Sequence, residues 1–289
     1  MYAAPFEYVR AASWQEAVER LAEGGEDARV IAGGQSLIPM MTMRLAEPAV
    51  LVDVARAAER TIERSDGALV LSALVRHVDL ERSEAVAEAC PVLAEGANHI
   101  GNVRVRHRGT IGGSMAHGDP TSELGCIAVA LGGTVRTLGP AGARAIPAGE
   151  LFVTHFTTAL EPGEVITHVE LPALRAGQGA AFLELSPGHF GSVEVAALVE
   201  QDAGGRCAGA RIAVGATADR PVDVTAAADL AGESIDERTA AAAGRAVADA
   251  VEVGPSVHGS AGYRREMVAV LTKRALLTAV ARARGGDGR

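Results

Sequence analysis

The strongest structural signal in this chain is the stretch Val30-Ile31-Ala32-Gly33-Gly34-Gln35-Ser36. A short apolar run ends in a Gly-Gly pair, and an amide and a hydroxyl side chain follow. Successive backbone N–H groups converge on one point only where φ is unusual and no Cβ blocks the ligand, and both conditions favour glycine. The stretch therefore predicts a tight turn that binds anionic oxygens.

A second stretch of the same kind follows much later, as Gly109-Thr110-Ile111-Gly112-Gly113-Ser114. Two such turns in one chain predict that both hold one diphosphate. A P-loop would need a lysine after its last glycine, but Gln35 and Ser114 stand there, so ATP or GTP hydrolysis is disfavoured. No Gly-x-Gly-x-x-Gly occurs either, which argues against the usual Rossmann dinucleotide site. Dinucleotide binding of another kind remains.

Composition limits the possible functions. The chain has 289 residues, 48% of them hydrophobic and 22% charged, so a globular protein with a sizeable core is expected. Its net charge of -9 argues against a general nucleic-acid surface. No apolar run approaches the ~18–20 residues of a membrane span, and the N-terminus lacks the features of a secretion signal. A cytoplasmic protein is expected.

Metal binding is not expected from this chain alone. Cys90, Cys126 and Cys207 form no Cys-x-x-Cys pair, so neither an iron–sulfur cluster nor a structural zinc is predicted. The histidines and the acid around the second glycine stretch also match no standard ligand spacing.

The patterning along the chain indicates alternating strands and helices. A capping box at Ser13-Trp14-Gln15-Glu16 starts a helix that ends at Gly24-Gly25. Further strands are predicted over residues 29–32, 50–54, 68–71, 134–136, 165–170, 193–200 and 211–216, and further helices from Pro39 and over residues 83–100 with a break at Pro91, 122–131, 235–251 and 263–284. Residues 171–179 are rich in breakers and predict a linker. The strands and helices beyond it suggest one sheet with helices on one face.

The alternating Arg104, Arg106 and Arg108 predict a charged strand or loop face, because an extended backbone places alternate side chains on one side. The alternative is that these arginines contact a partner subunit or a phosphate group.

The residues around the glycine stretches resemble a known family. Ala32-Gly33-Gly34-Gln35-Ser36-Leu37-Ile38-Pro39-Met40-Met41, followed by Arg44-Leu45-Ala46-Glu47-Pro48, resembles the first FAD loop of the medium subunits of molybdenum hydroxylases. This family includes the carbon monoxide dehydrogenase medium subunit and the FAD parts of xanthine, nicotine and quinoline dehydrogenases. Residues 100–120 are similar to its other FAD loop. Tyr263-Arg264-Arg265-Glu266-Met267 and Leu271-Thr272-Lys273-Arg274-Ala275-Leu276 are similar to its C-terminal helix, so the resemblance spans the chain.

The resemblance implies an α+β fold of three domains. Two subdomains, residues 1–56 and 57–175, would form an FAD-binding fold of the vanillyl-alcohol-oxidase type. Residues 176–289 would form a C-terminal domain of antiparallel strands with helices on one face.

The resemblance also implies where FAD binds. The loops of residues 32–37 and 110–114 would hold the diphosphate, with Asp119 near the adenosine ribose, Ile166 beside the adenine or flavin edge, and Phe190 near the isoalloxazine. The implied cofactor-binding residues are Ala32, Gly33, Gly34, Gln35, Ser36, Leu37, Ile100, Thr110, Ile111, Gly112, Gly113, Ser114, His117, Asp119, Ile166 and Phe190.

One segment departs from the family pattern. Leu185-Ser186-Pro187-Gly188-His189-Phe190 lacks the usual basic cluster and has His189 where the family has an acid. The resemblance places this segment at the flavin ring, so the departure concerns how the isoalloxazine is gated and which acceptor takes its electrons.

The implied function is electron transfer through FAD, as the medium subunit of a larger oxidoreductase. A large partner subunit would bear the molybdenum cofactor and a small one two [2Fe–2S] clusters, in a dimer of heterotrimers. No catalytic side chain is expected, because the redox chemistry belongs to the cofactor. Two alternatives remain: a self-sufficient FAD-dependent oxidoreductase of the same superfold, and a flavin-free scaffold subunit.

Overall fold

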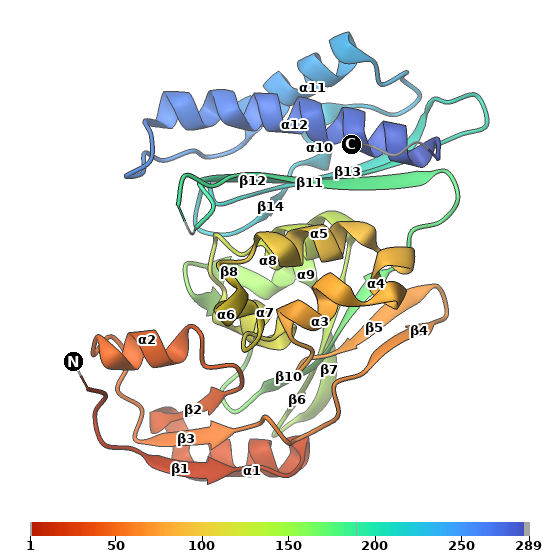
Figure 1. Cartoon of the computed structure of the whole chain (residues 1–289). Helices are drawn as coiled ribbons and strands as arrows, with labels where there is room; N and C mark the ends of the chain where they lie inside the picture. The colour runs from red at the N-terminus through yellow and green to blue at the C-terminus, as the bar shows by residue number, and fades with distance from the viewer. Residues whose placement is uncertain (1, 189, 286–289) are drawn as a thin grey trace.

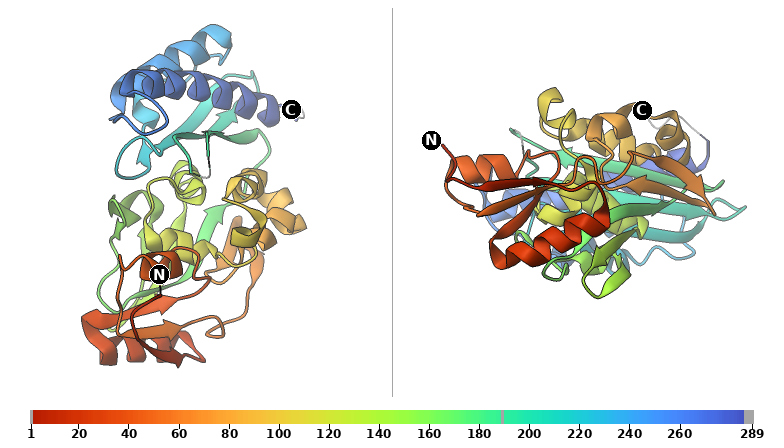
Figure 2. Two further views of the ribbon diagram at one scale, coloured as in Figure 1. Left: turned by 60° about the vertical axis from the view of Figure 1, so that its left-hand side comes forward. Right: turned by 90° about the horizontal axis from the view of Figure 1, so that it is seen from below.

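The structure is a computed structural model that describes residues 2–188 and 190–285. Figure 1 and the left view of Figure 2 show three parts stacked along the long axis of the molecule, with the N-terminal sheet at one end and the long C-terminal helices at the other. The expected α+β class is confirmed, as is a C-terminal antiparallel sheet with helices on one face. His189 lies outside the described residues.

The N-terminal part is a small parallel sheet of order β1-β3-β2. Its elements are β1 (Glu7–Arg10), α1 (Trp14–Gly24), the 3-10 turn η1 (Gly25–Asp27), β2 (Ala28–Ile31), α2 (Leu37–Thr42) and β3 (Val50–Asp53). Helix α1 begins as predicted, because the Ser13 hydroxyl accepts the Glu16 N–H at 3.1 Å. Its buried Ala17, Val18 and Leu21 pack on the sheet. Strand β1 was not predicted, since its side chains are mostly exposed and show no apolar face.

The middle part holds the largest core, around an antiparallel sheet of order β4-β5-β10-β6-β7. Its strands are β4 (Ile62–Ser65), β5 (Ala68–Ser72), β6 (Thr134–Gly139), β7 (Gly142–Pro147) and β10 (Val165–Pro172), with the separate pair β8 (Phe152–Thr154) and β9 (Thr157–Thr158). Its helices are α3 (His77–Arg82), α4 (Glu84–Ala89), α5 (Pro91–His99), α6 (Val103–Arg106), α7 (Ile111–His117), α8 (Glu123–Leu131) and α9 (Ala148–Leu151). The predicted break at Pro91 is confirmed, because it separates α4 from α5.

The C-terminal part is an antiparallel sheet of order β11-β12-β13-β14. Its elements are β11 (Gln178–Leu185), β12 (Val193–Gln201), β13 (Cys207–Gly215), β14 (Val222–Asp223), α10 (Thr225–Ala228), α11 (Glu237–Ala250) and α12 (Ala261–Ala283). Helices α11 and α12 cover one face (Figure 1). The other face packs on the middle part, since Ala180, Ala196 and Ala213 belong to its core. Both faces of this sheet are therefore buried.

The predicted linker over residues 171–179 is too long. Leu171 and Pro172 pair with β5 at the end of β10, and Gln178 already pairs with β12. Gly179 belongs to β11, and a Cβ there would lie 2.1 Å from the carbonyl oxygen of Ala279. This glycine allows α12 to pack directly on the strand, so it serves packing and not chain flexibility.

The expected extended arginine face is wrong. Val103–Arg106 forms a single helical turn, α6, because the Asn102 side chain accepts the N–H groups of Arg104 and Val105 at 2.9 and 3.4 Å. Arg106 instead pairs with Glu81 at 2.9 Å. An N-cap can override the alternation of charges, since it satisfies backbone donors that an extended chain would leave to solvent.

None of the helices in the described part of the chain is long and apolar enough to cross a membrane.

The contact between α11 and α12 depends on Gly244. A Cβ there would lie 2.4 Å from the Ala269 carbonyl oxygen, whereas a Cβ at Gly262 meets nothing within 4 Å. We expect Gly244→Ala to lower the free energy of unfolding by about 1–3 kcal/mol through overpacking. Gly262→Ala should leave it unchanged or raise it by up to ~1 kcal/mol, as helix propensity favours alanine. Urea unfolding measures both, and a gain in Gly244→Ala would contradict the packing.

Candidate functional site

A cavity of about 750 Å³ lies between the N-terminal and middle parts and extends to Phe190 at the C-terminal domain. This volume falls within the ~300–1,000 Å³ typical of ligand sites. The predicted site residues that line it are Ala32, Gly33, Gly34, Gln35, Ser36, Leu37, Ile100, Thr110, Gly112, Gly113, Ser114, His117, Asp119, Ile166 and Phe190. The remaining one, Ile111, is fully buried in the core and does not line the cavity.

The first glycine stretch forms the predicted turn between β2 and α2. Gly34 has a φ of 71°, which a side chain would strain, so the turn requires glycine there. The backbone N–H groups of residues 33–37 make no hydrogen bond to any described residue. Since all five residues line the cavity, the turn offers a run of unused donors to a ligand.

The second glycine stretch is not the open turn that was predicted. Helix α7 begins at Ile111, and the Thr110 hydroxyl accepts the Gly113 N–H at 3.1 Å. The N–H groups of Ile111, Gly112 and Ser114 donate to the carbonyl oxygens of Val75, Ala73 and Thr110, all at 3.0 Å. All four amides are therefore already used by the protein.

The glycines of the second stretch serve close packing instead. A Cβ at Gly112 would lie 2.4 Å from the Ala73 Cβ and 2.9 Å from the Ala73 carbonyl oxygen. The stretch thus docks tightly on the chain that follows β5, and sequence alone could not distinguish this packing from an anion-binding turn.

The two stretches also contact each other. A Cβ at Gly33 would lie 2.2 Å from the Arg108 carbonyl oxygen and 2.8 Å from the Gly109 Cα. Only a glycine lets these backbones approach so closely. The contact joins the N-terminal part to the middle part at the wall of the cavity.

His77 at the start of α3 is a cavity residue that sequence reasoning missed. Its ring is almost fully buried, and Nε2 lies 3.1 Å from the Ser114 hydroxyl oxygen. Burial lowers the pKa of His77 to about 4, so the ring is neutral at pH 7. A lone histidine after an apolar strand gives no sequence signal for this contact.

His117 and Asp119 lie along the same wall. The His117 ring stacks at 5.0 Å between centroids on Phe156, and burial lowers the pKa of His117. Asp119 Oδ1 accepts the Thr121 N–H and hydroxyl at 2.9 and 2.8 Å. Phe156 and Phe190 line the cavity while more than half exposed, so aromatic rings flank its opening.

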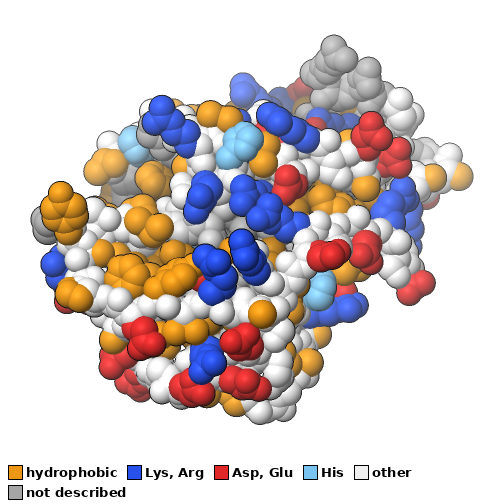
Figure 3. All heavy atoms as spheres, turned by 60° about the horizontal axis from the view of Figure 1, so that its bottom comes forward, with side chains coloured by type: hydrophobic (Ala, Val, Ile, Leu, Met, Phe, Trp, Pro, Cys, Tyr) orange, Lys and Arg blue, Asp and Glu red, His pale blue; other side chains and the backbone are white. Residues whose placement is uncertain are grey.

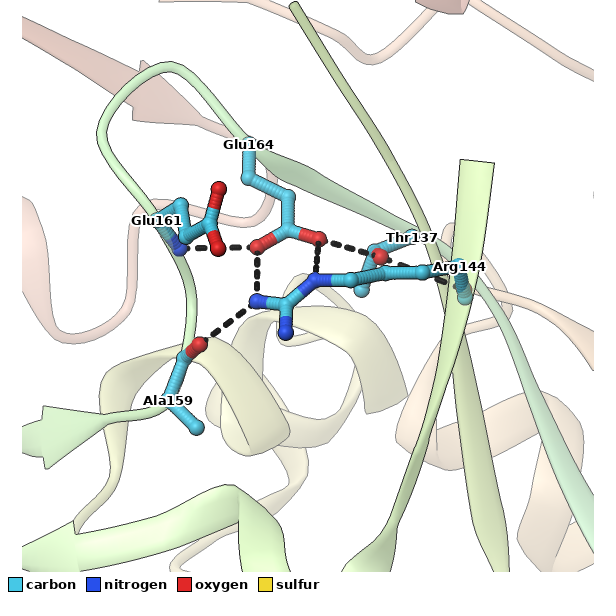
Figure 4. A network of polar contacts seen from close by, with 5 residues as sticks. All are labelled: Thr137, Arg144, Ala159, Glu161 and Glu164. Atoms are coloured by element: carbon cyan, nitrogen blue, oxygen red, sulfur yellow. Dashed lines mark hydrogen bonds and ion pairs between the residues drawn. The ribbon is translucent and has the colours of Figure 1, made fainter. Parts of the chain in front are cut away.

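A network around Glu164 supports the strand that carries Ile166 (Figure 4). The Glu164 carboxylate accepts Arg144 Nε and Nη2 at 2.7 and 2.6 Å, the Glu161 N–H at 2.7 Å, and the Thr137 hydroxyl. Burial alone would raise the pKa of Glu164, but these hydrogen bonds lower it. Arg144 also donates to the Ala159 carbonyl oxygen at 2.7 Å. The network holds the turn that leads into β10.

Lys and Arg side chains gather near the middle of one face (Figure 3), although the net charge is -9. Figure 3 also shows a strip of hydrophobic side chains beside them. Burial, followed by the charges of Arg60 and Arg108, lowers the pKa of Arg76, so these three arginines lie near one another. Arg108 directly precedes Gly109 of the cavity wall. Among the residues that the structure describes, no group of His, Cys, Asp and Glu is arranged to hold a metal ion.

The Glu164 network predicts a pH-dependent effect of Thr137→Val. The substitution removes a hydroxyl that donates to a carboxylate, so we expect the free energy of unfolding to fall by about 1.5–3 kcal/mol at pH 7. The pKa of Glu164 is lowered from 4.5, so its stabilisation is complete above pH 4.5 and is lost as the pH falls through the folded-state pKa. The difference between wild type and variant should therefore narrow in acid.

Thr134→Val on the same strand is the matched control, because the Thr134 hydroxyl makes no hydrogen bond within the described residues. Denaturant unfolding at several pH values measures both variants. Equal effects of the two substitutions would contradict the network.

The chain matches two family models. Residues 4–174 match the FAD binding domain in molybdopterin dehydrogenase, and residues 187–279 match the CO dehydrogenase flavoprotein C-terminal domain. The two matches together cover most of the chain.

Similar proteins match over almost their whole length. The 6-hydroxypseudooxynicotine dehydrogenase complex subunit alpha of Paenarthrobacter nicotinovorans is 40% identical, with 96% of each chain covered. The carbon monoxide dehydrogenase medium chain of Afipia carboxidovorans is 35% identical, with 96% of this chain and 98% of the relative covered.

Solved structures agree with these matches. Carbon monoxide dehydrogenase from Hydrogenophaga pseudoflava superposes with a TM-score of 0.94 at 35% identity, covering 98% of this chain and 99% of that chain. Quinoline 2-oxidoreductase from Pseudomonas putida 86 gives 0.92 at 36% identity, with the same coverage. The chain therefore belongs to the FAD-binding medium subunits of the molybdenum hydroxylases, the family of the carbon monoxide dehydrogenase medium chains.

Proposed function

We propose that this chain binds FAD in the cavity and is the electron outlet of a molybdenum hydroxylase. It takes electrons from the [2Fe–2S] clusters of a small partner subunit and passes them to an external acceptor. A large partner subunit carries the molybdenum cofactor, and the complex is a dimer of heterotrimers. Family membership supports this assignment, because the chain matches an FAD binding domain and medium chains of dehydrogenases.

The observation that carries the proposal is the run of unused amides in residues 33–37. Consecutive N–H groups with no protein partner carry partial positive charge and suit the oxygens of a diphosphate. The turn lies on the cavity wall, and its two glycines have no side chain that would keep ligand oxygens away from the backbone N–H groups. Residues 33–37 thus hold the diphosphate in this proposal.

The second stretch has a different role in this proposal from the one that its sequence predicted. The backbone amides of residues 111–114 already donate to protein oxygens. The Ser114 hydroxyl therefore makes the polar contact with the diphosphate in this proposal. The neutral His77 ring can donate from Nε2 to the Ser114 oxygen at 3.1 Å, which leaves the hydroxyl proton free to donate to a phosphate oxygen. His77 is therefore a positioning residue for Ser114.

The remaining predicted residues contact different parts of FAD along the cavity in this proposal. Asp119 lies near the adenosine ribose, Ile166 beside the adenine or flavin edge, and Phe190 near the isoalloxazine. Ala32, Ile100, Thr110, Gly112, Gly113 and His117 complete the wall. When bound, FAD supplies the exchange between two-electron and one-electron chemistry, while the chain binds it, orients it and excludes water from it.

The domain boundaries belong to the same proposal. Residues 1–56 and 57–175 form the two subdomains that enclose FAD, and residues 176–289 form the C-terminal domain. The three sheets, each formed by strands from within one of these ranges, support this division.

An absorption spectrum of the purified chain, with the released cofactor identified by mass, tests the function. The proposal expects one FAD per chain and co-purification with iron–sulfur and molybdenum subunits. FAD without such partners would favour a self-sufficient oxidoreductase. A colourless chain that also fails to bind added FAD would favour the scaffold alternative.

Gly33→Ala tests the position of the diphosphate. The added Cβ would clash with the Arg108 carbonyl oxygen at 2.2 Å and displace the turn. We expect a cost of about 1–3 kcal/mol, or roughly a fivefold to 150-fold weaker affinity for FAD. Gly149→Ala is the control, since a Cβ there meets nothing within 4 Å. Titration of the apo-chain with FAD, followed by flavin fluorescence, measures both, and unchanged affinity in Gly33→Ala would refute the assignment.

A further inference from the structure

Four titratable side chains lie close together where the C-terminal sheet packs on the middle part. They come from four different elements: His99 from α5, Glu123 from α8, Glu184 from β11 and Glu194 from β12. Glu184 and Glu194 are cross-strand neighbours, His99 contacts Glu184, and Glu123 interacts electrostatically with Glu184 and His99. We call them the buried acid cluster. The proposed diphosphate site uses none of them, although Glu123 lines the cavity.

Glu194 is the most unusual member. The residue is completely buried, and neither carboxyl oxygen has a hydrogen-bond partner among the described residues. A Cβ at Gly191 would lie 2.3 Å from Oε1, and a Cβ at Gly215 would lie 2.6 Å from Oε2. Two glycines therefore make the space that this carboxyl group occupies.

Glu194 is held in its neutral form. An isolated ionised carboxylate in an apolar interior is very unfavourable, so such a group keeps its proton. Burial, followed by the charges of Glu123 and Glu184, raises the pKa of Glu194 well above its usual value. Burial and the charge of Glu194 raise the pKa of the neighbouring Cys126 thiol as well, so this thiol also stays neutral.

One end of the cluster reaches solvent through His99. The His99 side chain is 46% exposed, and its Nδ1 lies 3.2 Å from Oε2 of Glu184, whose side chain is only 2% exposed. The hydrogen bond to Glu184 raises the pKa of His99. His99 thus connects a buried carboxyl group to bulk water.

The other end reaches the cavity through Glu123. This residue is 7% exposed, and burial raises its pKa to about 8, with a further contribution from the charge of Glu184. The negative charge of Asp119, which also lines the cavity, raises the pKa of Glu123 as well. A carboxyl group with this pKa can take up or release a proton near neutral pH.

Nearby cations on the packed elements have other partners. On α12, Arg282 pairs with Glu95 at 2.7 Å. The guanidinium of Arg264 donates to the backbone carbonyl oxygens of Ser192, Gly254 and Ala216. Within the described residues, His99 pairs with a carboxylate of the cluster, that of Glu184.

We propose that Glu123 and Glu194 form a proton store that exchanges protons with solvent past the contact between His99 and Glu184 and serves the cavity that binds FAD. This inference rests on the proposed function. The [2Fe–2S] clusters of the partner supply two electrons, and flavin reduction takes up a proton with them. That leaves one added negative charge, which the cluster compensates when the Glu123 carboxylate binds a second proton. Reoxidation by the external acceptor returns that proton to solvent.

The apo-chain tests the store without any cofactor. The pKa of Glu123 rises from 4.5 to about 8 on folding, so its stabilising contribution is complete below pH 4.5 and is lost as the pH rises to about 8. The unfolding free energy of wild type, taken relative to Glu123→Gln, should decline over this interval. Glu194→Gln should keep the wild-type stability at pH 7, because glutamine mimics a neutral carboxyl group. The proposal of a proton store would be overturned if the difference in unfolding free energy between wild type and Glu123→Gln did not change with pH. Strong destabilisation by Glu194→Gln would also overturn it.

The flavin-loaded chain tests the coupling, through the midpoint potential of the flavin measured against pH. Wild type should show a change of slope near pH 8 that is lost in Glu123→Gln and retained in the control Glu266→Gln, an exposed residue of α12. Identical curves in all three proteins would overturn the coupling while leaving the proposed function intact. A chain that binds no FAD would refute the proposed function, and the apo-chain titration would still report on the cluster.

Discussion

The site depends on the close approach of two backbones, at Gly33 and at Arg108 and Gly109. This contact joins the small parallel sheet to the middle part and closes one wall of the cavity. No side chain fits there, so the approach requires glycine. The first stretch lies at this contact, so its residues form part of the cavity wall. The turn that follows requires the positive φ at Gly34.

The two glycine stretches look alike in sequence but have different physical roles. The first keeps five consecutive amides without a partner among the described residues, whereas the amides of the second donate to Thr110, Ala73 and Val75. A bound anion would therefore be held asymmetrically, by backbone donors on one side and by the Ser114 hydroxyl, backed by His77, on the other. Family membership and this asymmetry support the same cofactor.

The C-terminal sheet does more than cover the middle part. Residues that alternate along β12 face either the helical layer, as Val193 and Val195 do, or the middle core, as Ala196 does. Glu194 breaks the apolar pattern on the latter face and is accommodated by Gly191 and Gly215. A buried carboxyl group costs stability unless it is neutral or paired, and Glu194 meets this condition by keeping its proton.

The sequence by itself determined the main helices and strands, because caps, breakers and apolar periodicity act locally. Its resemblance to a known family indicated the α+β class and the segments that line the cavity. The tertiary structure decided what those residues do. It showed that Ile111 faces the core, that α6 is helical, and that His77, Glu164 and Glu194 lie beside residues distant in sequence. Close approach, burial and hydrogen-bond partners depend on segments meeting in space, and no local pattern encodes those distances.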